Sequence, residues 1–433
     1  MKFSKNSLIT FIFTSPHIIL AYIIKLFIAN YFGPEGVGDI TLITNYVNWI
    51  SFAGVLGLSI SNVYFYNRDH SKMNIIYWNS TLFILILSAF LIFIYFVMSP
   101  VFLKKVSPYL VKAAFPMVAF ALYIDVMKST LAARLWFIRF GIAYILPIVL
   151  NLTFIIFLVM TGNFTVLNTI YSIVFSYFFT FLFCFFSSRK GVEKQSTDLG
   201  FLWKSIKYGM RGHIGNIFQK FNYRLDFYII QWFKDVSTVG YYGISTAIAE
   251  GLLFIPRSIS TVLLPVVSSF EDDEESYIYT SRVCRVTFFI VSFTGLLLLI
   301  FGRWLIIIFF PDFMKSVIPM YLLVPGLVFL SLANVLANFF SGRGSPEIAA
   351  YGSLTALIMT VIFDIVLIPK YGIIGASIAS SISYITCAGV FVYFFIKRTK
   401  LPITSFIIIT KGDINYLIKM LKQRYNGNSS RKN

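Results

Sequence analysis

A short row of polar residues at helical spacing is the feature of the sequence most suggestive of chemistry. The intervals are three, four and four residues, which places the row on one face of a helix: His213, Asn216, Lys220 and Arg224. Tyr223 borders that face. A charge facing lipid costs about 2.5–3.5 kcal/mol, so we expect the row to line a water-filled cavity. Fixed cations with hydrogen-bond donors suit an anionic ligand such as a pyrophosphate. The alternative is that the two cations neutralise acids on neighbouring helices.

Other charges lie in apolar surroundings. Lys25 either gives the same cavity a second cationic wall or extends its side chain to the membrane surface. Glu250 and Arg257 share a helical face but lie about 10 Å apart along it, so we expect each to pair with another helix. Glu250 binds a proton or coupling cation, or else neutralises Lys220 or Arg224, and we favour the ion pair.

Three acids complete the set of intramembrane charges. Asp226 lies two residues from Arg224 and points elsewhere, so we expect it to be a packing acid. Asp125 and Asp364 are similar cases, and Asp364 is also a candidate for coupling or for an ion pair. Burial would favour the neutral form of such an acid, and a nearby cation would favour the charged form.

The composition tells what kind of molecule must position these residues. Of 433 residues, 58% are hydrophobic and 12% are charged, and the mean hydropathy is +0.80. This charged fraction is about half of that in soluble domains, which excludes a soluble enzyme, a disulfide scaffold and a disordered chain. The three cysteines are far apart, the histidines lack metal-ligand spacing, and no phosphate-binding loop occurs. We therefore predict an integral membrane protein without metal, catalytic residues or cofactor, driven by proton or sodium coupling if at all.

Apolar runs of the necessary length, about 20 residues, predict twelve membrane-spanning helices. The first follows Lys2 and Lys5, runs about 24 residues and precedes no A-x-A site, so we expect it to be retained. The twelve lie near 8–31, 41–66, 77–98, 109–127, 141–160, 166–187, 209–232, 239–268, 285–308, 316–340, 348–368 and 373–396.

The distribution of basic residues predicts the orientation. If the N-terminus is inside, loops and tails on the cytoplasmic side hold 25 Lys and Arg, and the opposite side holds 5. Both termini are then cytoplasmic. Because the basic residues that set this orientation account for the net charge of +18, we expect no nucleic-acid partner.

A polar, basic connection in the middle of the chain divides it into two halves of six spans. We expect an N-terminal lobe over 1–187, a cytoplasmic inter-lobe loop over 188–208, a C-terminal lobe over 209–396 and a basic tail over 397–433. The pairs Val37-Gly38 and Val239-Gly240, 202 residues apart, suggest an internal repeat. In the tail, Asp413 precedes an apolar stripe with basic flanks, which predicts an amphipathic helix on anionic lipid.

Three segments carry a family resemblance. They are YFGPEGVGDITLITNYVNWISFAGVLGLSISNVYF (31–65), RLDFYIIQWFKDVSTVGYYGISTAIAEGLLFIPRSISTVLLPVVSS (224–269) and GRGSPEIAAYGSLTALIMTVIFDIVLIPKYGIIGASIASSISY (342–384). In this order they resemble the O-antigen and capsule repeat-unit flippases of the multidrug/oligosaccharidyl-lipid/polysaccharide exporter superfamily. Asp364 departs from the pattern, which has a neutral polar residue there, usually Asn.

The resemblance implies an all-α fold of two pseudo-symmetric six-helix lobes in a V, with a central cavity. It also implies that an undecaprenyl-pyrophosphate-linked oligosaccharide crosses from the inner to the outer leaflet by alternating access. We expect a monomer in the cell inner membrane, with a polysaccharide polymerase and a chain-length regulator as candidate partners.

Three alternative functions agree less well with the sequence. A cation-coupled multidrug exporter of the same superfamily would need an acidic cavity, whereas the first and seventh spans are mainly cationic. A polysaccharide polymerase or ligase would carry a large external loop, which the predicted spans leave no room for. A non-transporting assembly protein would have little use for charges within the membrane.

Overall fold

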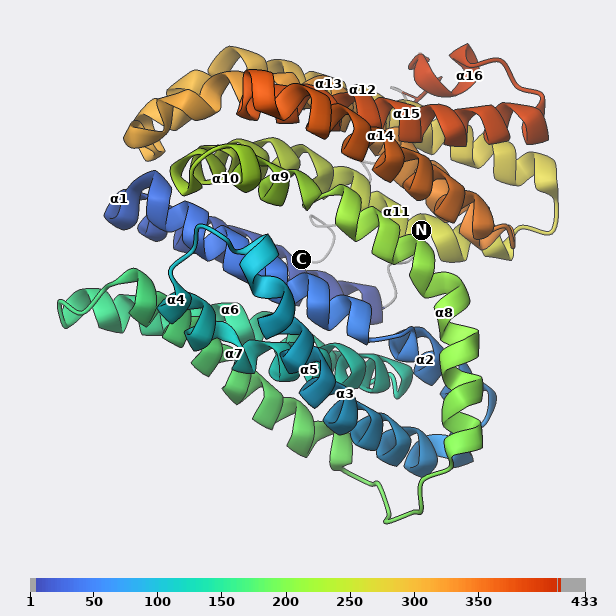
Figure 1. Cartoon of the computed structure of the whole chain (residues 1–433). Helices are drawn as coiled ribbons and strands as arrows, with labels where there is room; N and C mark the ends of the chain where they lie inside the picture. The colour runs from blue at the N-terminus through green and yellow to red at the C-terminus, as the bar shows by residue number, and fades with distance from the viewer. Residues whose placement is uncertain (1–4, 411, 414–433) are drawn as a thin grey trace, which may run out of the picture.

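The computed structural model describes residues 5–410, 412 and 413, and every regular element in that part of the chain is helical (Figure 1). The first half contains α1 (Lys5–Gly54), α2 (Leu58–Arg68), α3 (Met73–Phe102), α4 (Pro108–Ala114), α5 (Pro116–Ala133), α6 (Phe137–Met160) and α7 (Val166–Arg189). The second contains α8 (Leu199–Asn222), α9 (Leu225–Phe233), α10 (Val236–Glu250), α11 (Phe254–Ser269), α12 (Asp273–Phe309), α13 (Val317–Gly342), α14 (Glu347–Tyr371), α15 (Ile373–Thr399) and α16 (Thr404–Ile407).

Within the described residues, nine segments are long and apolar enough to cross a membrane. One of them falls within α1, which Gly33 divides at a left-handed kink (φ 61°) into the first two expected spans. Two further crossings are interrupted helices: α8 continues as α9 after Tyr223–Arg224, and α10 continues as α11 after a short 3-10 turn (Gly251–Leu253). Together these make the twelve spans that the sequence predicts.

The helices form two groups that we call the N-lobe (α1–α7) and the C-lobe (α9–α15). Figure 1 shows the lobes close together where α1 meets α10 and diverging toward the side where α8 joins them. This is the expected V. Helix α8 packs on α2 of the N-lobe and on α14 of the C-lobe, so it bridges the open side.

We call the contact between α1 and α10 the closed end. Equivalent positions of the internal repeat make this contact from both sides. A Cβ atom added to Gly38 would overlap with the backbone oxygen of Val236, and one added to Gly240 would overlap with that of Pro34. Pro34 and Val236 are 202 residues apart, as are Gly38 and Gly240. The internal repeat therefore places each glycine against its partner's equivalent position, and the two helices touch through their backbones.

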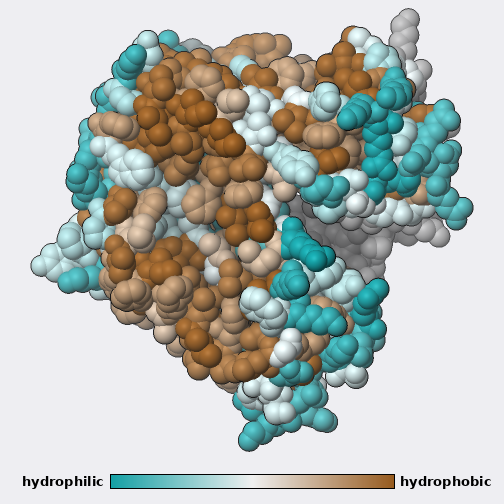
Figure 2. All heavy atoms as spheres, turned by 45° about the vertical axis from the view of Figure 1, so that its right-hand side comes forward, coloured by the Kyte–Doolittle hydropathy of each residue, from teal (hydrophilic) through white to brown (hydrophobic). Residues whose placement is uncertain are grey.

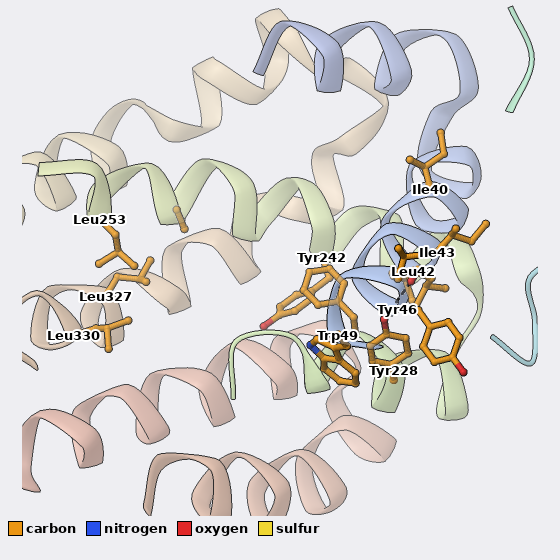
Figure 3. Packing of buried hydrophobic residues seen from close by; sticks show 14 of the residues in the cluster. Ile40, Leu42, Ile43, Tyr46, Trp49, Tyr228, Tyr242, Leu253, Leu327 and Leu330 are labelled. Atoms are coloured by element: carbon orange, nitrogen blue, oxygen red, sulfur yellow. Dashed lines mark hydrogen bonds between the residues drawn. The ribbon is translucent and has the colours of Figure 1, made fainter. Parts of the chain in front are cut away.

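Aromatic side chains fill the space next to the closed end (Figure 3). The indole of Trp49 in α1 stacks on Phe221 with ring centroids 4.4 Å apart and lies 4.5 Å from the ring of Tyr228. The Tyr228 hydroxyl donates to the Leu42 carbonyl at 3.1 Å. These rings join the lobes by burial of large apolar surfaces as well as by backbone contact.

Two boundaries differ from the sequence prediction. Helix α8 begins at Leu199, not near 209, because the Asp198 carboxylate accepts from Phe201 N at 2.9 Å and caps it. The inter-lobe connection is correspondingly shorter. Helix α5 extends to Ala133, so Lys128, expected in a cytoplasmic loop, lies on a helix.

Part of the tail is held against α12. The buried Asp413 carboxylate accepts from the Arg285 guanidinium at 2.6 and 2.8 Å, and this pairing holds the Asp413 pKa below its usual range. The expected amphipathic helix that follows Asp413 lies outside the described residues.

Candidate functional site

Arg224 lies in the break between α8 and α9. Its guanidinium makes a two-pronged ion pair with Glu250, with N–O distances of 2.5 and 2.9 Å. Arg224 and Glu250 remain 29% and 18% exposed, so the pair sits at the edge of the protein interior. Glu250 and Arg224 are thus ion-pair partners in this structure.

Lys220 lies four residues before Arg224 in the chain, and its surroundings are different. Its ammonium is 4.0 Å from the centre of the Phe52 ring in the N-lobe. Among the described residues no carboxylate lies within ion-pair distance of it. Lys220 is therefore a partly buried cation stabilised by an aromatic face, with its charge available to an anion.

The other members of the row have different surroundings. His213 is 3% exposed, and its Nε2 lies 3.0 Å from the Phe52 carbonyl oxygen, so it joins α8 to the N-lobe in this conformation. Asn216 is exposed. The Tyr223 hydroxyl accepts from the Gln219 amide at 3.2 Å. Asn216 and Lys220 thus keep the accessibility that the proposed cavity face requires, and His213 does not.

Lys25 faces the C-lobe. Its ammonium donates to the Gly243 carbonyl at 2.5 Å, and the Tyr22 hydroxyl donates to the Ala247 carbonyl. Both bonds cross from α1 to α10. Lys25 thus lies where the two lobes face each other, a region that we call the seam, rather than at the membrane surface.

Lys128 lies near Lys220, although the spacing of polar residues in the sequence did not include it among the candidate residues. Lys128 and Asp125 form an i,i+3 ion pair on α5 at 2.8 Å, and both interact electrostatically with Lys220 across the seam. The i,i+3 spacing of Asp125 and Lys128 can be read from the sequence. However, a fourth span that ends at 127 places Lys128 in a loop.

The seam carries an excess of positive charge. Lys25, Arg224 and the exposed Arg257 each interact electrostatically with Glu250, and Arg224 also interacts with Asp226. Lys220 interacts in the same way with Lys128 and Asp125. Five cations thus stand against three carboxylates. Figure 2 shows a broad hydrophobic surface, with hydrophilic residues gathered toward the right of that view.

A second cluster lies inside the C-lobe. The Asp226 carboxylate is 1% exposed and accepts from the Tyr242 hydroxyl at 2.5 Å and the Ser380 hydroxyl at 3.2 Å. Asp364 is fully buried, interacts electrostatically with Asp226, and has no hydrogen-bond partner on either carboxylate oxygen. Two buried acids meet here, one of them unsatisfied, which no spacing in the sequence indicated because they come from α9 and α14.

Comparison with known families decides the class of protein. The family model described as lipid II flippase MurJ matches residues 71–424, well over half of the chain. The chain belongs to the lipid II flippase family. A solved structure of the lipid II flippase MurJ in an inward closed conformation has the same fold, with a TM-score of 0.75 and 17% identity over 92% of this chain and 89% of that one. The nine apolar helices long enough to cross a membrane within the described residues agree with a multi-pass membrane protein of this family.

Two curated relatives match over shorter stretches. The probable low-salt glycan biosynthesis flippase Agl15 of Haloferax volcanii is 23% identical over 42% of this chain and 39% of that protein. The capsular polysaccharide biosynthesis protein CapF of Staphylococcus aureus is 30% identical over 36% of this chain and 41% of that protein. The match thus spans about two fifths of each relative.

Proposed function

We propose that this flippase moves an undecaprenyl-pyrophosphate-linked oligosaccharide repeat unit from the inner to the outer leaflet by alternating access. The product would feed O-antigen, capsule or exopolysaccharide synthesis. The observation that carries the proposal is the cationic seam between the lobes, in particular Lys220, which has no carboxylate partner among the described residues. A pyrophosphate supplies the negative charge that this seam lacks. The names of the glycan and capsule relatives support a saccharide substrate.

The cations take separate roles in this proposal. Lys220 binds the pyrophosphate, and Lys25 and Arg257 extend the positive wall. Arg224 holds the bent segment through Glu250 and meets substrate with the donors that this pair leaves free. Asn216 and Tyr223 offer hydrogen bonds to sugar hydroxyls. His213 would join them once α8 moves away from Phe52.

We further propose that the C-lobe cluster couples transport to an ion. An unpaired buried carboxylate is costly unless a proton or a cation neutralises it, and Asp364 has no protein donor. Oxygen atoms from Asp226, Ser380 and Asp364 suit a proton or a hard cation such as sodium. The flippase would act as a monomer in the inner membrane with both termini cytoplasmic, and a polymerase and a chain-length regulator would use its product.

Charge variants of Lys220 test the substrate role. Loss of a hydrogen bond to a charged group costs about 1.5–3 kcal/mol, so Lys220→Ala should lower export roughly ten- to a hundredfold. Lys220→Arg should retain part of the activity, and Lys220→Glu should abolish it. The measurement is surface polysaccharide per flippase molecule in membranes of cells that lack their own flippase.

Arg224→Glu is the matched comparison, because it replaces an ion pair with two carboxylates that repel each other. It should lower membrane abundance, and Glu250→Arg in the same chain should restore it. Normal export by an abundant Lys220→Glu variant would exclude the cationic-seam mechanism.

Two further outcomes separate the competing substrates. If the chain rescued cells depleted of their lipid II flippase and left surface polysaccharide unchanged, the repeat-unit proposal would be wrong. Export of cationic drugs, unaffected by Lys220→Glu, would instead indicate a multidrug exporter.

A further inference from the structure

A groove of about 530 Å³ runs between α14 and α15, the two neighbouring helices of the C-lobe (Figure 1). Tyr351 and Thr355 line it from α14, and Gly389, Tyr393 and Phe394 line it from α15. Tyr351 and Tyr393 are 55% and 59% exposed. The groove is therefore open to the surroundings of the protein, which for these helices is the lipid bilayer.

Gly389 forms part of the groove wall on α15. A Cβ atom added there would meet no atom within 4 Å, although the residue lies in the middle of a helix. Glycine costs helix stability of roughly 1 kcal/mol relative to alanine. No close backbone approach accounts for it at this position, and its effect is to leave space on the outer face of α15.

Positive charge gathers at one end of the groove. Lys397 and Arg398 follow Tyr393 and Phe394 by one helical turn, and both are exposed. The Lys397 ammonium is 6.0 Å from the Tyr393 ring centre, and Arg398 reaches the Ser345 hydroxyl at 3.4 Å. Within the described residues neither cation has an ion-pair partner, and the exposed Glu347 at the start of α14 pairs with neither.

We propose that the groove is a binding site for an anionic phospholipid of the surrounding bilayer. One acyl chain lies along Gly389 between Tyr351 and Tyr393, and the phosphate rests on Lys397 and Arg398. Apolar and aromatic walls suit hydrocarbon, and tyrosine rings prefer the depth at which chains meet headgroups. Basic residues at the end of a groove between membrane helices bind anionic headgroups. In the proposed orientation this is an inner-leaflet lipid, and its binding does not depend on the transported substrate.

The test uses the purified full-length flippase in detergent micelles titrated with phosphatidylglycerol or with phosphatidylcholine of the same acyl chains. Phosphatidylglycerol should raise the thermal unfolding midpoint and be retained as a discrete adduct in native mass spectrometry, and phosphatidylcholine should not. Lys397→Gln and Arg398→Gln should each weaken the apparent affinity about fivefold. Gly389→Phe should remove the adduct with all charges intact, because its Cβ atom enters open space and its ring occupies the groove.

Matched controls separate this site from general charge attraction. Lys190→Gln with Lys194→Gln removes two other exposed cations, and Val366→Phe adds a ring to an exposed position of α14 outside the groove lining. Both controls should retain the adduct. Equal loss in the lysine controls, or an unchanged adduct in Gly389→Phe, would overturn the proposal. So would displacement by glycerol phosphate alone, which indicates a free-phosphate site, or tighter binding of undecaprenyl phosphate in the groove, which indicates a substrate lipid.

Discussion

Lys220 and Arg224 are four residues apart, Lys220 in the last turn of α8 and Arg224 in the break that follows it, and they have different partners. Arg224 is neutralised by Glu250 through two short contacts, whereas Lys220 rests on the ring of Phe52. A bidentate pair in a partly buried place is costly to break by removing one member, because the other charge is then left uncompensated. Variants of Arg224 therefore report on folding as well as on transport, and Lys220 is the cleaner probe of substrate binding.

Asp364 permits a prediction about coupling. Asparagine has nearly the same shape as the neutral acid, so Asp364→Asn should leave membrane abundance unchanged. It cannot release a proton or neutralise a bound cation, so export should no longer respond to an imposed sodium or pH gradient. The measurement is export in membrane vesicles with each gradient applied in turn.

The outcome depends on which ion is used. If only the sodium response disappears in Asp364→Asn, the cluster holds sodium, and if only the pH response disappears, it holds a proton. Gradient responses equal to those of the unchanged protein would place coupling elsewhere in the chain.

At the scale of elements, the α1–α10 contact explains how the closed end is sealed. Gly38 and Gly240 let two helices approach until their backbones touch, and the internal repeat makes the contact reciprocal. Hydrogen bonds from the Trp232 indole to the Val101 carbonyl at 2.8 Å and from the Asn30 amide to the Phe309 carbonyl at 3.2 Å also join the lobes. Trp232 and Asn30 are themselves 202 residues apart, so they extend the same symmetry.

A single methyl group should open this seal. Gly240→Ala places a Cβ atom against the Pro34 carbonyl oxygen, where backbone on both sides leaves no room. A cysteine at Thr41, which lies beside α10 at Gly243, should then react at least several times faster with a membrane-impermeant thiol reagent added outside the cell. The three native cysteines are buried and should contribute little background.

Gly389→Ala is the matched control for this substitution, since its Cβ atom enters open space. Its labelling rate should equal that of the unchanged protein. A slow rate in Gly240→Ala as well would mean that the closed end can absorb the methyl group and that other contacts hold it shut.

At the scale of the whole molecule, the proposed orientation would place the closed end outside the cell and the side bridged by α8 in the cytoplasm. The α6–α7 turn at Gly162 and the α7–α8 connection around Thr197 lie at opposite ends of α7. Alkaline phosphatase fused after Gly162 should be active, and the same enzyme fused after Thr197 should be silent, because basic residues concentrate near the second site. The reverse pattern would invert the direction of transport that we propose.

The sequence alone determined the class of the molecule, because hydrophobic runs of membrane-spanning length can belong to few other structures. The helix count and the internal repeat followed from the same runs and from the positions of glycine pairs. Helical spacing also identified the face of α8 that carries Asn216 and Lys220, since periodicity is a local property of the chain.

Only the tertiary structure decided which charges are paired and which are available. Arg224 and Lys220 belong to the same row of polar residues in the sequence, and both carry a positive charge. Glu250, which comes from another helix, pairs only with Arg224. Asp226 and Asp364 meet although 138 residues separate them in the chain. Lys128 entered the seam because α5 continues past the expected end of its span. Such pairings depend on how the helices pack against one another. The hydropathy along the chain does not predict which polar atoms of different helices come into contact.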